Sequence, residues 1–191
     1  MSMSNLLKKD TKFTIAEIGS IETNFIKSEI DLFTEEWNQN TSRQDNNIVH
    51  VNTKMYPIKF FSYDWVRGQD IDVQEVNSFK TAEAIKQLND IYSFLESYYS
   101  GRVVRVEIVK MMPHTQIVRH VDGGEMLTIT RRCHIPITTA DEVYFGVFGN
   151  SINMKVGSIY EINNLLPHEV QNNSDVERDH LILDILPFEM L

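Results

Sequence analysis

The sequence predicts a mainly β protein, an antiparallel sandwich or jelly roll with helices packed outside one sheet. From residue 102 onward, eight short segments rich in Val, Ile, Tyr and Thr are separated by Gly, Asn, Asp or Pro. No convincing helix interrupts these segments, which favours antiparallel strands. At 191 residues, a single domain over 1–191 is expected, with a mixed α/β part over 1–101 and a β core over 102–187.

The N-terminal part is predicted to supply two helices and two short strands. The first helix is indicated by apolar residues at helical spacing, namely Ile26, Ile30, Phe33 and Trp37, with Thr23 or Asn24 as the cap. A polar stretch at 38–47 follows it, and short strands are expected at 48–51 and 58–61. The second helix is expected over 81–99, with Ile85, Leu88, Tyr92 and Leu95 facing inward and Gly101 as the stop.

The β core is predicted to contain eight strands. Their expected ranges are 103–111, 115–120, 127–137, 143–148, 152–156, 158–162, 168–172 and 180–186. The ranges are rich in Val, Ile, Tyr and Thr, and they are bounded by Gly, Asn, Asp or Pro. The two preceding helices are expected to cover the outside of one sheet.

Composition and charge exclude several classes of partner. The net charge is −9 and no long Lys/Arg cluster occurs, so a nucleic acid is not expected as partner. No apolar run approaches the ~20 residues that span a bilayer, and the first ten residues lack the apolar stretch of a signal peptide. The single cysteine, Cys133, excludes an internal disulfide and fits a reducing compartment. A cytoplasmic protein, monomeric or dimeric and without a membrane partner, is expected.

Three residues carry the most specific chemical signal in the chain. His120 and Asp122 lie in the segment Arg-His-Val-Asp-Gly-Gly, and His168 follows much later in Leu-Leu-Pro-His-Glu-Val. On a strand, His120 and Asp122 project to the same side, and His168 opens another strand that could complete the site. Two histidines and one carboxylate form the face that binds Fe(II) and leaves positions open for a co-substrate and dioxygen. Taken alone, the three residues leave a structural interpretation equally open, because His-x-Asp also occurs by chance.

A second group of residues suggests an anion site beside the metal. Arg132 and His134 share one face of a predicted strand with Cys133 on the other, and Arg178 precedes an apolar strand. Arginine binds a carboxylate through two parallel hydrogen bonds, so this set would suit a dicarboxylate that chelates the metal at one end. Alternatively, Arg131 and Arg132 are solvated charges on an edge strand, and Arg178 is neutralised by Glu177 and Asp179. His180 shares a strand face with Arg178 and is the strongest further candidate.

The order and spacing of these segments resemble one enzyme family. The segments are Met-Pro-His-Thr-Gln-Ile-Val-Arg-His-Val-Asp (112–122), Arg-Arg-Cys-His-Ile-Pro-Ile (131–137), and His-Glu-Val-Gln-Asn (168–172), followed by Arg178 and Leu-Ile-Leu-Asp-Ile (181–185). Together they are similar to the aspartyl/asparaginyl β-hydroxylases, which are Fe(II)- and 2-oxoglutarate-dependent dioxygenases built on a double-stranded β-helix. The resemblance covers roughly residues 102–187, and the spacing of ten from His168 to Arg178 is specific.

The resemblance implies a role for each candidate residue. His120, Asp122 and His168 would bind iron, and Arg132, His134 and Arg178 would bind 2-oxoglutarate. The strand with His120 would neighbour the strand with His168, and the strand with Arg132 the one with Arg178. Some members of the family have no carboxylate where this chain has Asp122, and His114 stands where a glycine often occurs.

The expected reaction is hydroxylation of an unactivated C–H bond with dioxygen as co-substrate. By the resemblance, the substrate is an Asp or Asn residue of a peptide or protein, or a free amino acid. Two other classes remain open: a cupin-type metalloenzyme that does not use 2-oxoglutarate, and a non-catalytic β-sandwich binding module.

Overall fold

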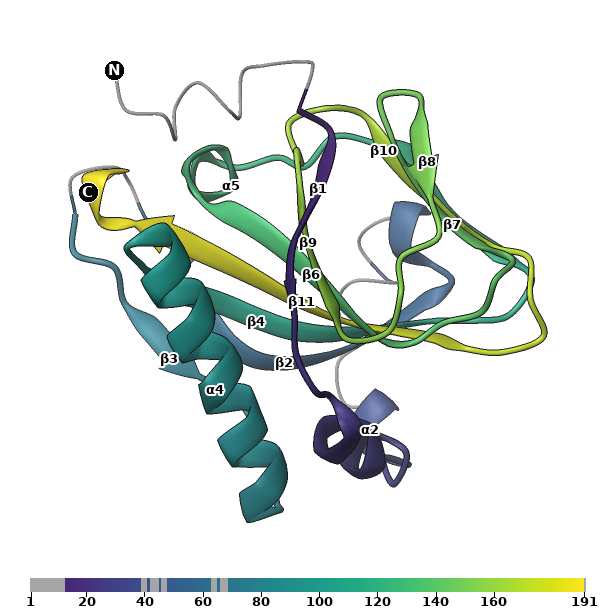
Figure 1. The fold of residues 1–191 in the computed structure, drawn as a ribbon, viewed down its shortest axis with the longest axis horizontal. Helices are drawn as coiled ribbons and strands as arrows, with labels where there is room; N and C mark the ends of the chain where they lie inside the picture. The colour runs from purple at the N-terminus through teal and green to yellow at the C-terminus, as the bar shows by residue number, and fades with distance from the viewer. Residues whose placement is uncertain are drawn as a thin grey trace.

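The computed structural model describes residues 13–38, 41, 45, 48–62, 65 and 69–190. Two antiparallel sheets face each other, and helices cover the outer side of the larger one (Figure 1). The larger sheet contains, in spatial order, β1 (Ile15–Ser20), β9 (Ser158–Ile162), β6 (Arg131–Thr138), β11 (Arg178–Pro187), β4 (Gly101–Met111), β2 (Thr53–Phe61) and β3 (Val73–Glu75). The smaller sheet contains β5 (Thr115–His120), β10 (His168–Asn172), β7 (Val143–Val147) and β8 (Asn150–Ile152). The predicted jelly-roll fold is confirmed.

The larger sheet is buried on both faces, and β11 at its centre shows why. Every residue of β11 is buried, and its side chains alternate between two environments. Leu181 and Leu183 face the core under the helices, whereas Arg178 and His180 face the space between the sheets. Apolar residues of both sheets fill most of that space, among them Met111, Phe145, Val147, Tyr160 and Ile162. The polar side chains on the inner face of β11 are therefore exceptions within an apolar interior.

The predicted second helix is α4 (Ala82–Tyr99), and it packs on the outer face of the larger sheet. Thr81 caps it by accepting a hydrogen bond from the Ala84 N–H, and the Glu29 carboxylate accepts one from the Thr81 N–H. The buried face differs from the predicted one: Ala84, Leu88, Ile91 and Leu95 are buried, whereas Ile85 is exposed and Tyr92 is partly buried. Leu88 and Leu95 are thus buried as predicted, whereas Ala84 and Ile91 take the buried places expected for Ile85 and Tyr92.

Helix α4 ends at Tyr99, as predicted, but Ser100 and not Gly101 is the residue that stops it. Ser100 has a φ of 47° and so takes the left-handed conformation that glycine usually supplies at this position. Gly101 is already the first residue of β4, where a Cβ atom would lie 2.5 Å from the Leu186 carbonyl oxygen. The glycine is therefore required by close strand packing and not by the end of the helix.

The predicted first helix is divided in two. It forms α2 (Asn24–Ile30) and, after a turn, the 3-10 helix η1 (Glu36–Asn38). Ile26, Ile30, Phe33 and Trp37 are nevertheless all buried in the core under the helices, so the apolar spacing identified the buried side chains correctly. Most of the predicted polar stretch at 38–47 lies outside the described residues.

Three strand predictions were wrong in part, and two strands were missed. Residues 48–50 form the 3-10 helix η2 (Ile48–His50), and the strand begins later, at Thr53. The first part of the strand predicted at 127–137 is α5 (Glu125–Ile129), because Met126 and Ile129 pack into a separate apolar cluster with Trp65. The strand predicted at 152–156 lies at 150–152, and β1 and β3 were not predicted. The remaining core strands lie within two residues of their predicted ranges.

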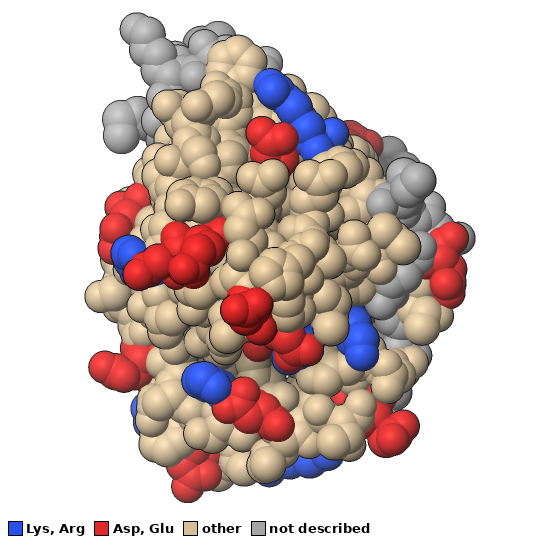
Figure 2. Space-filling view, turned by 90° about the vertical axis from the view of Figure 1, so that its right-hand side faces the viewer, with Lys and Arg blue, Asp and Glu red and all other residues tan. Residues whose placement is uncertain are grey.

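The N-terminal hundred residues contribute to the same sheet as the C-terminal β core. β1 pairs with β9 at one edge, and β2 pairs with β4 toward the other. A short 3-10 helix, η3 (Phe188–Met190), ends the described chain. Within the described residues, no helix has both the length and the apolar character that crossing a bilayer requires. On the face in Figure 2, acidic and basic side chains are interspersed and form no continuous basic patch.

Candidate active site

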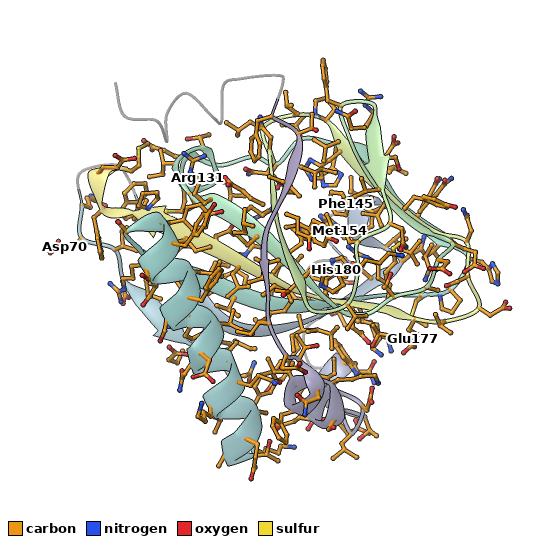
Figure 3. The ribbon with its side chains drawn as sticks, in the orientation of Figure 1. Asp70, Arg131, Phe145, Met154, Glu177 and His180 are labelled. Atoms are coloured by element: carbon orange, nitrogen blue, oxygen red, sulfur yellow. The ribbon has the colours of Figure 1, made fainter. Side chains whose placement is uncertain are left out.

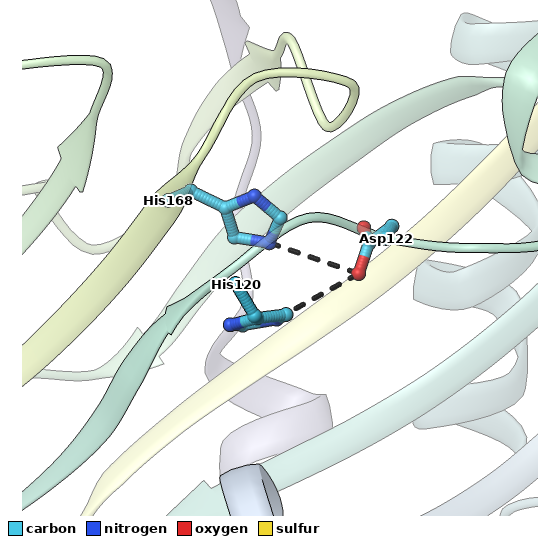
Figure 4. A group of neighbouring side chains, drawn as sticks. All are labelled: His120, Asp122 and His168. Carbon is cyan, nitrogen blue, oxygen red and sulfur yellow. Dashed lines mark ion pairs between the residues drawn. The ribbon is translucent and has the colours of Figure 1, made fainter.

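Three possible metal ligands meet where β5 ends and β10 begins. His120 is the last residue of β5 and pairs with His168, the first residue of β10, so that their ring centroids lie 4.3 Å apart. Asp122 follows just beyond the end of β5, where its backbone N–H donates to the Asn164 carbonyl at 3.3 Å. Its Oδ1 atom lies 3.7 Å from the Nε2 atom of each histidine (Figure 4). One donor atom from each residue falls within 4.8 Å of the others.

Backbone hydrogen bonds orient both histidines toward the shared carboxylate. His120 Nδ1 lies 2.8 Å from the Val118 carbonyl oxygen, and His168 Nδ1 lies 3.0 Å from that of Leu166. A carbonyl only accepts, so each Nδ1 atom must carry the proton and each Nε2 atom keeps its lone pair. Metal-binding histidines in proteins are usually fixed in this way. The donor set thus fits a divalent metal that prefers nitrogen and oxygen ligands.

The charges around Asp122 keep it ionised. Burial disfavours its charged form, but the electrostatic interactions of Asp122, with Arg132 first and then with His168 and His120, outweigh that effect and lower the pKa of Asp122 to about 2. Burial also lowers the pKa of His168. A carboxylate anion beside a neutral imidazole is the protonation state that metal binding needs.

A second polar group lies between the sheets, around Arg178. This guanidinium is 2% exposed, and within the described chain it has no carboxylate within ion-pair distance. Its Nη2 donates to His180 Nδ1 at 2.8 Å, so the neutral His180 ring carries its proton on Nε2. Arg178 Nε, His180 Nε2 and both ring nitrogens of His134 are buried without a hydrogen-bond partner among the described residues. Buried donors left unpaired are costly, and an anionic ligand would satisfy them.

Burial shifts the pKa of each of these groups. It lowers the pKa of Arg178 to about 9, with only Asp179 opposing the shift. For His134 and His180, burial and then the charge of Arg178 hold the pKa well below the ordinary value of 6.5. Among the described residues, the arginine is thus a buried cation with no carboxylate within ion-pair distance, hydrogen-bonded to the neutral His180 imidazole.

Phe145 lies between the possible metal ligands and the polar group formed by Arg178, His180 and His134. Its ring is parallel to that of His168 at 6.3 Å and edge-on to that of His134 at 5.1 Å. The Arg178 guanidinium carbon lies 5.8 Å from the ring centroid. Figure 3 shows Phe145 and His180 pointing into the interior between the two sheets. The two groups therefore share one interior, separated by a single aromatic ring.

The sequence-predicted site residues are brought together with one difference. The strand of His120 neighbours that of His168, and β6 with Arg132 and His134 neighbours β11 with Arg178, as expected. Arg132, however, is paired with Asp122 and Asp184 and lies apart from the Arg178 group. His180 takes a place in that group, and its period-two spacing from Arg178 was the signal for it.

The buried histidines should make the protein labile to mild acid. Because the pKa values of His134 and His180 are lower in the native state than in the unfolded chain, acid protonates the unfolded chain first. Stability therefore begins to fall below about pH 7.5, and below pH 6.5 it falls by at most about 1.4 kcal/mol per histidine for each pH unit. Asp122 adds its own loss only below its ordinary pKa of 3.8. We expect urea unfolding at pH 7.5 and 5.0 to show this difference.

A double variant, His134→Gln with His180→Gln, provides the control for this pH dependence. It should flatten the difference in unfolding free energy between the two pH values. An unchanged difference would assign the acid lability to other groups.

Comparisons with known proteins bear on the family and the fold. The family model described as aspartyl/asparaginyl β-hydroxylase matches residues 23–187, which is most of the chain. Among curated proteins, no relative matches. Residues 23–101 thus also match the family, although the sequence motifs identified only the part after residue 102.

Several solved structures are similar in fold. AviO1 from Streptomyces viridochromogenes Tue57 is 12% identical, with 94% of this chain and 92% of that chain covered and a TM-score of 0.59. EvdMO1 is 13% identical, with 96% and 49% covered and a TM-score of 0.57. An oxidoreductase of the 2OG-Fe(II) oxygenase family from Burkholderia pseudomallei is 17% identical, with 71% and 66% covered and a TM-score of 0.51. At these identities the likeness concerns the fold alone.

The fold and the match over residues 23–187 agree with the resemblance that the motifs predicted. The chain belongs to the aspartyl/asparaginyl β-hydroxylase family and is a hydroxylase of that family.

Proposed function

We propose that this protein is an Fe(II)- and 2-oxoglutarate-dependent dioxygenase that hydroxylates an unactivated C–H bond. The observation that carries the proposal is that the His120, Asp122 and His168 donor atoms share one interior with the buried guanidinium of Arg178, which has an unsatisfied Nε–H. A metal site alone would suit many cupin-like proteins. A buried arginine without a counterion close to it indicates a co-substrate that is an anion as well as a metal ligand.

Each residue of the site has a definite task in this proposal. His120, Asp122 and His168 would hold Fe(II), and a set of three ligands leaves coordination positions open for the co-substrate and dioxygen. Arg178 would bind the far carboxylate of 2-oxoglutarate, and His180 Nε2–H would donate a further hydrogen bond to it. His134, whose ring packs against Phe145, would offer a ring nitrogen for a hydrogen bond to 2-oxoglutarate. When bound, Fe(II) supplies the chemistry by which dioxygen and 2-oxoglutarate give succinate, CO2 and a hydroxylated product.

The fixed protein groups contribute orientation and exclusion of water. The two histidines are locked by their backbone hydrogen bonds, and the Arg178 group is almost wholly buried. A co-substrate held at both ends in such an interior is oriented without further rearrangement. The family supports an Asp or Asn residue in a peptide or protein as the substrate, and a free amino acid remains the other candidate.

The decisive test is an anaerobic titration of metal-free protein with Fe(II) and 2-oxoglutarate, followed by visible absorption. We expect a metal-to-ligand charge-transfer band that needs both components. Iron binding without that band would move the protein to a metalloenzyme that does not use 2-oxoglutarate. A folded sample that binds no iron would exclude the enzymatic proposal and leave a β-sandwich binding module.

A further inference from the structure

A row of alternating charges crosses three adjacent strands on the inner face of the larger sheet. In the strand register, Asp184 of β11 lies directly between Arg132 of β6 and Arg105 of β4. Arg105 is held in turn by Glu107, with Nη2 2.8 Å from Oε2, and its Nη1 lies 3.6 Å from Asp184 Oδ2. The row ends at Asp122, which binds Arg132 from the loop after β5. The charges therefore form one connected network that reaches the candidate metal ligand.

Arg132 uses its whole guanidinium within this network. Its Nε and Nη2 atoms donate to the two carboxylate oxygens of Asp184 at 2.9 and 2.8 Å, and its Nη1 donates to Asp122 Oδ2. Asp184 is fully buried and the Arg132 side chain is 8% exposed. A fork-to-fork pair of this kind fixes the plane of the guanidinium as well as its position.

The two oxygens of Asp122 are thereby given different surroundings. Oδ2 accepts from Arg132, whereas Oδ1 faces the Nε2 atoms of His120 and His168 at 3.7 Å each. An unsupported carboxylate could rotate and offer a metal either one oxygen or both. With Oδ2 engaged, only Oδ1 is directed toward the point where the histidines converge.

We propose that Asp184 and Arg132 act as a buried clamp that positions Asp122 to bind the metal through one oxygen only. This inference rests on the proposed function, because it assumes that Fe(II) binds at His120, Asp122 and His168. It makes Arg132 and Asp184 positioning residues for the metal ligand, and it leaves the binding of 2-oxoglutarate to Arg178 and the neighbouring histidines. A one-oxygen carboxylate keeps more coordination positions free for the co-substrate and dioxygen.

The test compares Fe(II) binding in Asp184→Asn with that in a matched control. Glu161→Gln is the control, because Glu161 is also buried and pairs with an arginine of β6, Arg131 at 3.2 Å, but on the opposite face of the sheet. We expect Asp184→Asn to raise the Kd for Fe(II) by about 10- to 100-fold, as other partners of metal ligands do. Glu161→Gln should leave that Kd within about threefold, although both variants lose a buried ion pair.

Two further readouts separate positioning from general stability. The absorption spectrum of bound Co(II) should change in Asp184→Asn and not in Glu161→Gln, because it reports the ligand geometry. With saturating metal, the Kd for 2-oxoglutarate should stay within about threefold of the wild-type value in Asp184→Asn. If that variant does not fold, Arg132→Lys decides the question: it keeps the charge but cannot bind both carboxylates, and a loss of about tenfold in Fe(II) affinity is expected.

The outcomes distinguish this inference from the proposed function. Wild-type Fe(II) affinity in folded Asp184→Asn overturns the clamp alone. The same holds for a variant that loses affinity for 2-oxoglutarate and not for Fe(II), because Arg132 would then serve the co-substrate. A wild-type protein that binds no Fe(II) overturns the proposed function and the clamp with it.

Discussion

Replacing Asp122 with alanine is expected to remove bound iron and hydroxylase activity together. The substitution deletes the carboxylate oxygen that lies 3.7 Å from the Nε2 atom of each histidine. Two neutral imidazoles then remain, without the negative charge that partly balances a divalent cation. Altering a mere partner of a ligand costs about 10- to 100-fold in metal affinity, so loss of the ligand itself should exceed about 100-fold. The metal content after anaerobic dialysis against a weak chelator measures this directly.

Asp175→Ala is the matched control for this prediction. The side chain of Asp175 is 96% exposed, and its ion-pair partner among the described residues is the exposed His114. Its removal should change neither the metal content nor the activity. If Asp122→Ala keeps stoichiometric iron, Asp122 is not a ligand, and the site works like those of family members that have no carboxylate at this position.

Most of the core strands, and the approach of His120 to Asp122, could be predicted from the sequence because both depend on local patterns. Alternation of apolar residues determines which face of a strand is buried, and His120 and Asp122 are separated by one residue. Partners distant in sequence could not be found in that way. Arg132 and Asp184 are separated by 52 residues, and only the pairing of β6 with β11 shows that they face each other. The ion-pair partners of Arg132 could therefore be identified only from the structure.

The elements that were predicted incorrectly are those with a weak local sequence pattern. Residues 127–129, Leu-Thr-Ile, have the composition of a strand, yet they form the end of α5 because Ile129 packs with Met126 and Trp65. Tertiary packing overrides a weak β preference of this kind. β3 spans only three residues, too few for an alternating pattern to be recognised. The ends and pairing partners of α5 and β3 depend on residues that are distant in sequence.

Replacing Arg178 with methionine is expected to stabilise the ligand-free protein and to abolish its response to 2-oxoglutarate. Methionine fills a similar elongated space but removes a buried charge without a counterion, so the free energy of unfolding should rise by about 1–3 kcal/mol. In the wild-type protein loaded anaerobically with Fe(II), 2-oxoglutarate at 100 times its Kd should add about 2.7 kcal/mol. The variant should show none of this increase, and its activity should be lost while iron stays bound.

Urea unfolding with and without 2-oxoglutarate measures both effects in one experiment. Arg102→Met serves as the control, because Arg102 is an exposed arginine of β4, and it should alter neither the basal stability nor the response to the ligand. The direction of the change in unfolding free energy is more informative here than its size. Replacing a residue that only supports the fold would lower the free energy of unfolding. Replacing a residue that is retained for ligand binding should instead raise the free energy of unfolding of the ligand-free protein. A destabilised variant that still responds to 2-oxoglutarate would show that Arg178 supports the fold and that the anion binds elsewhere.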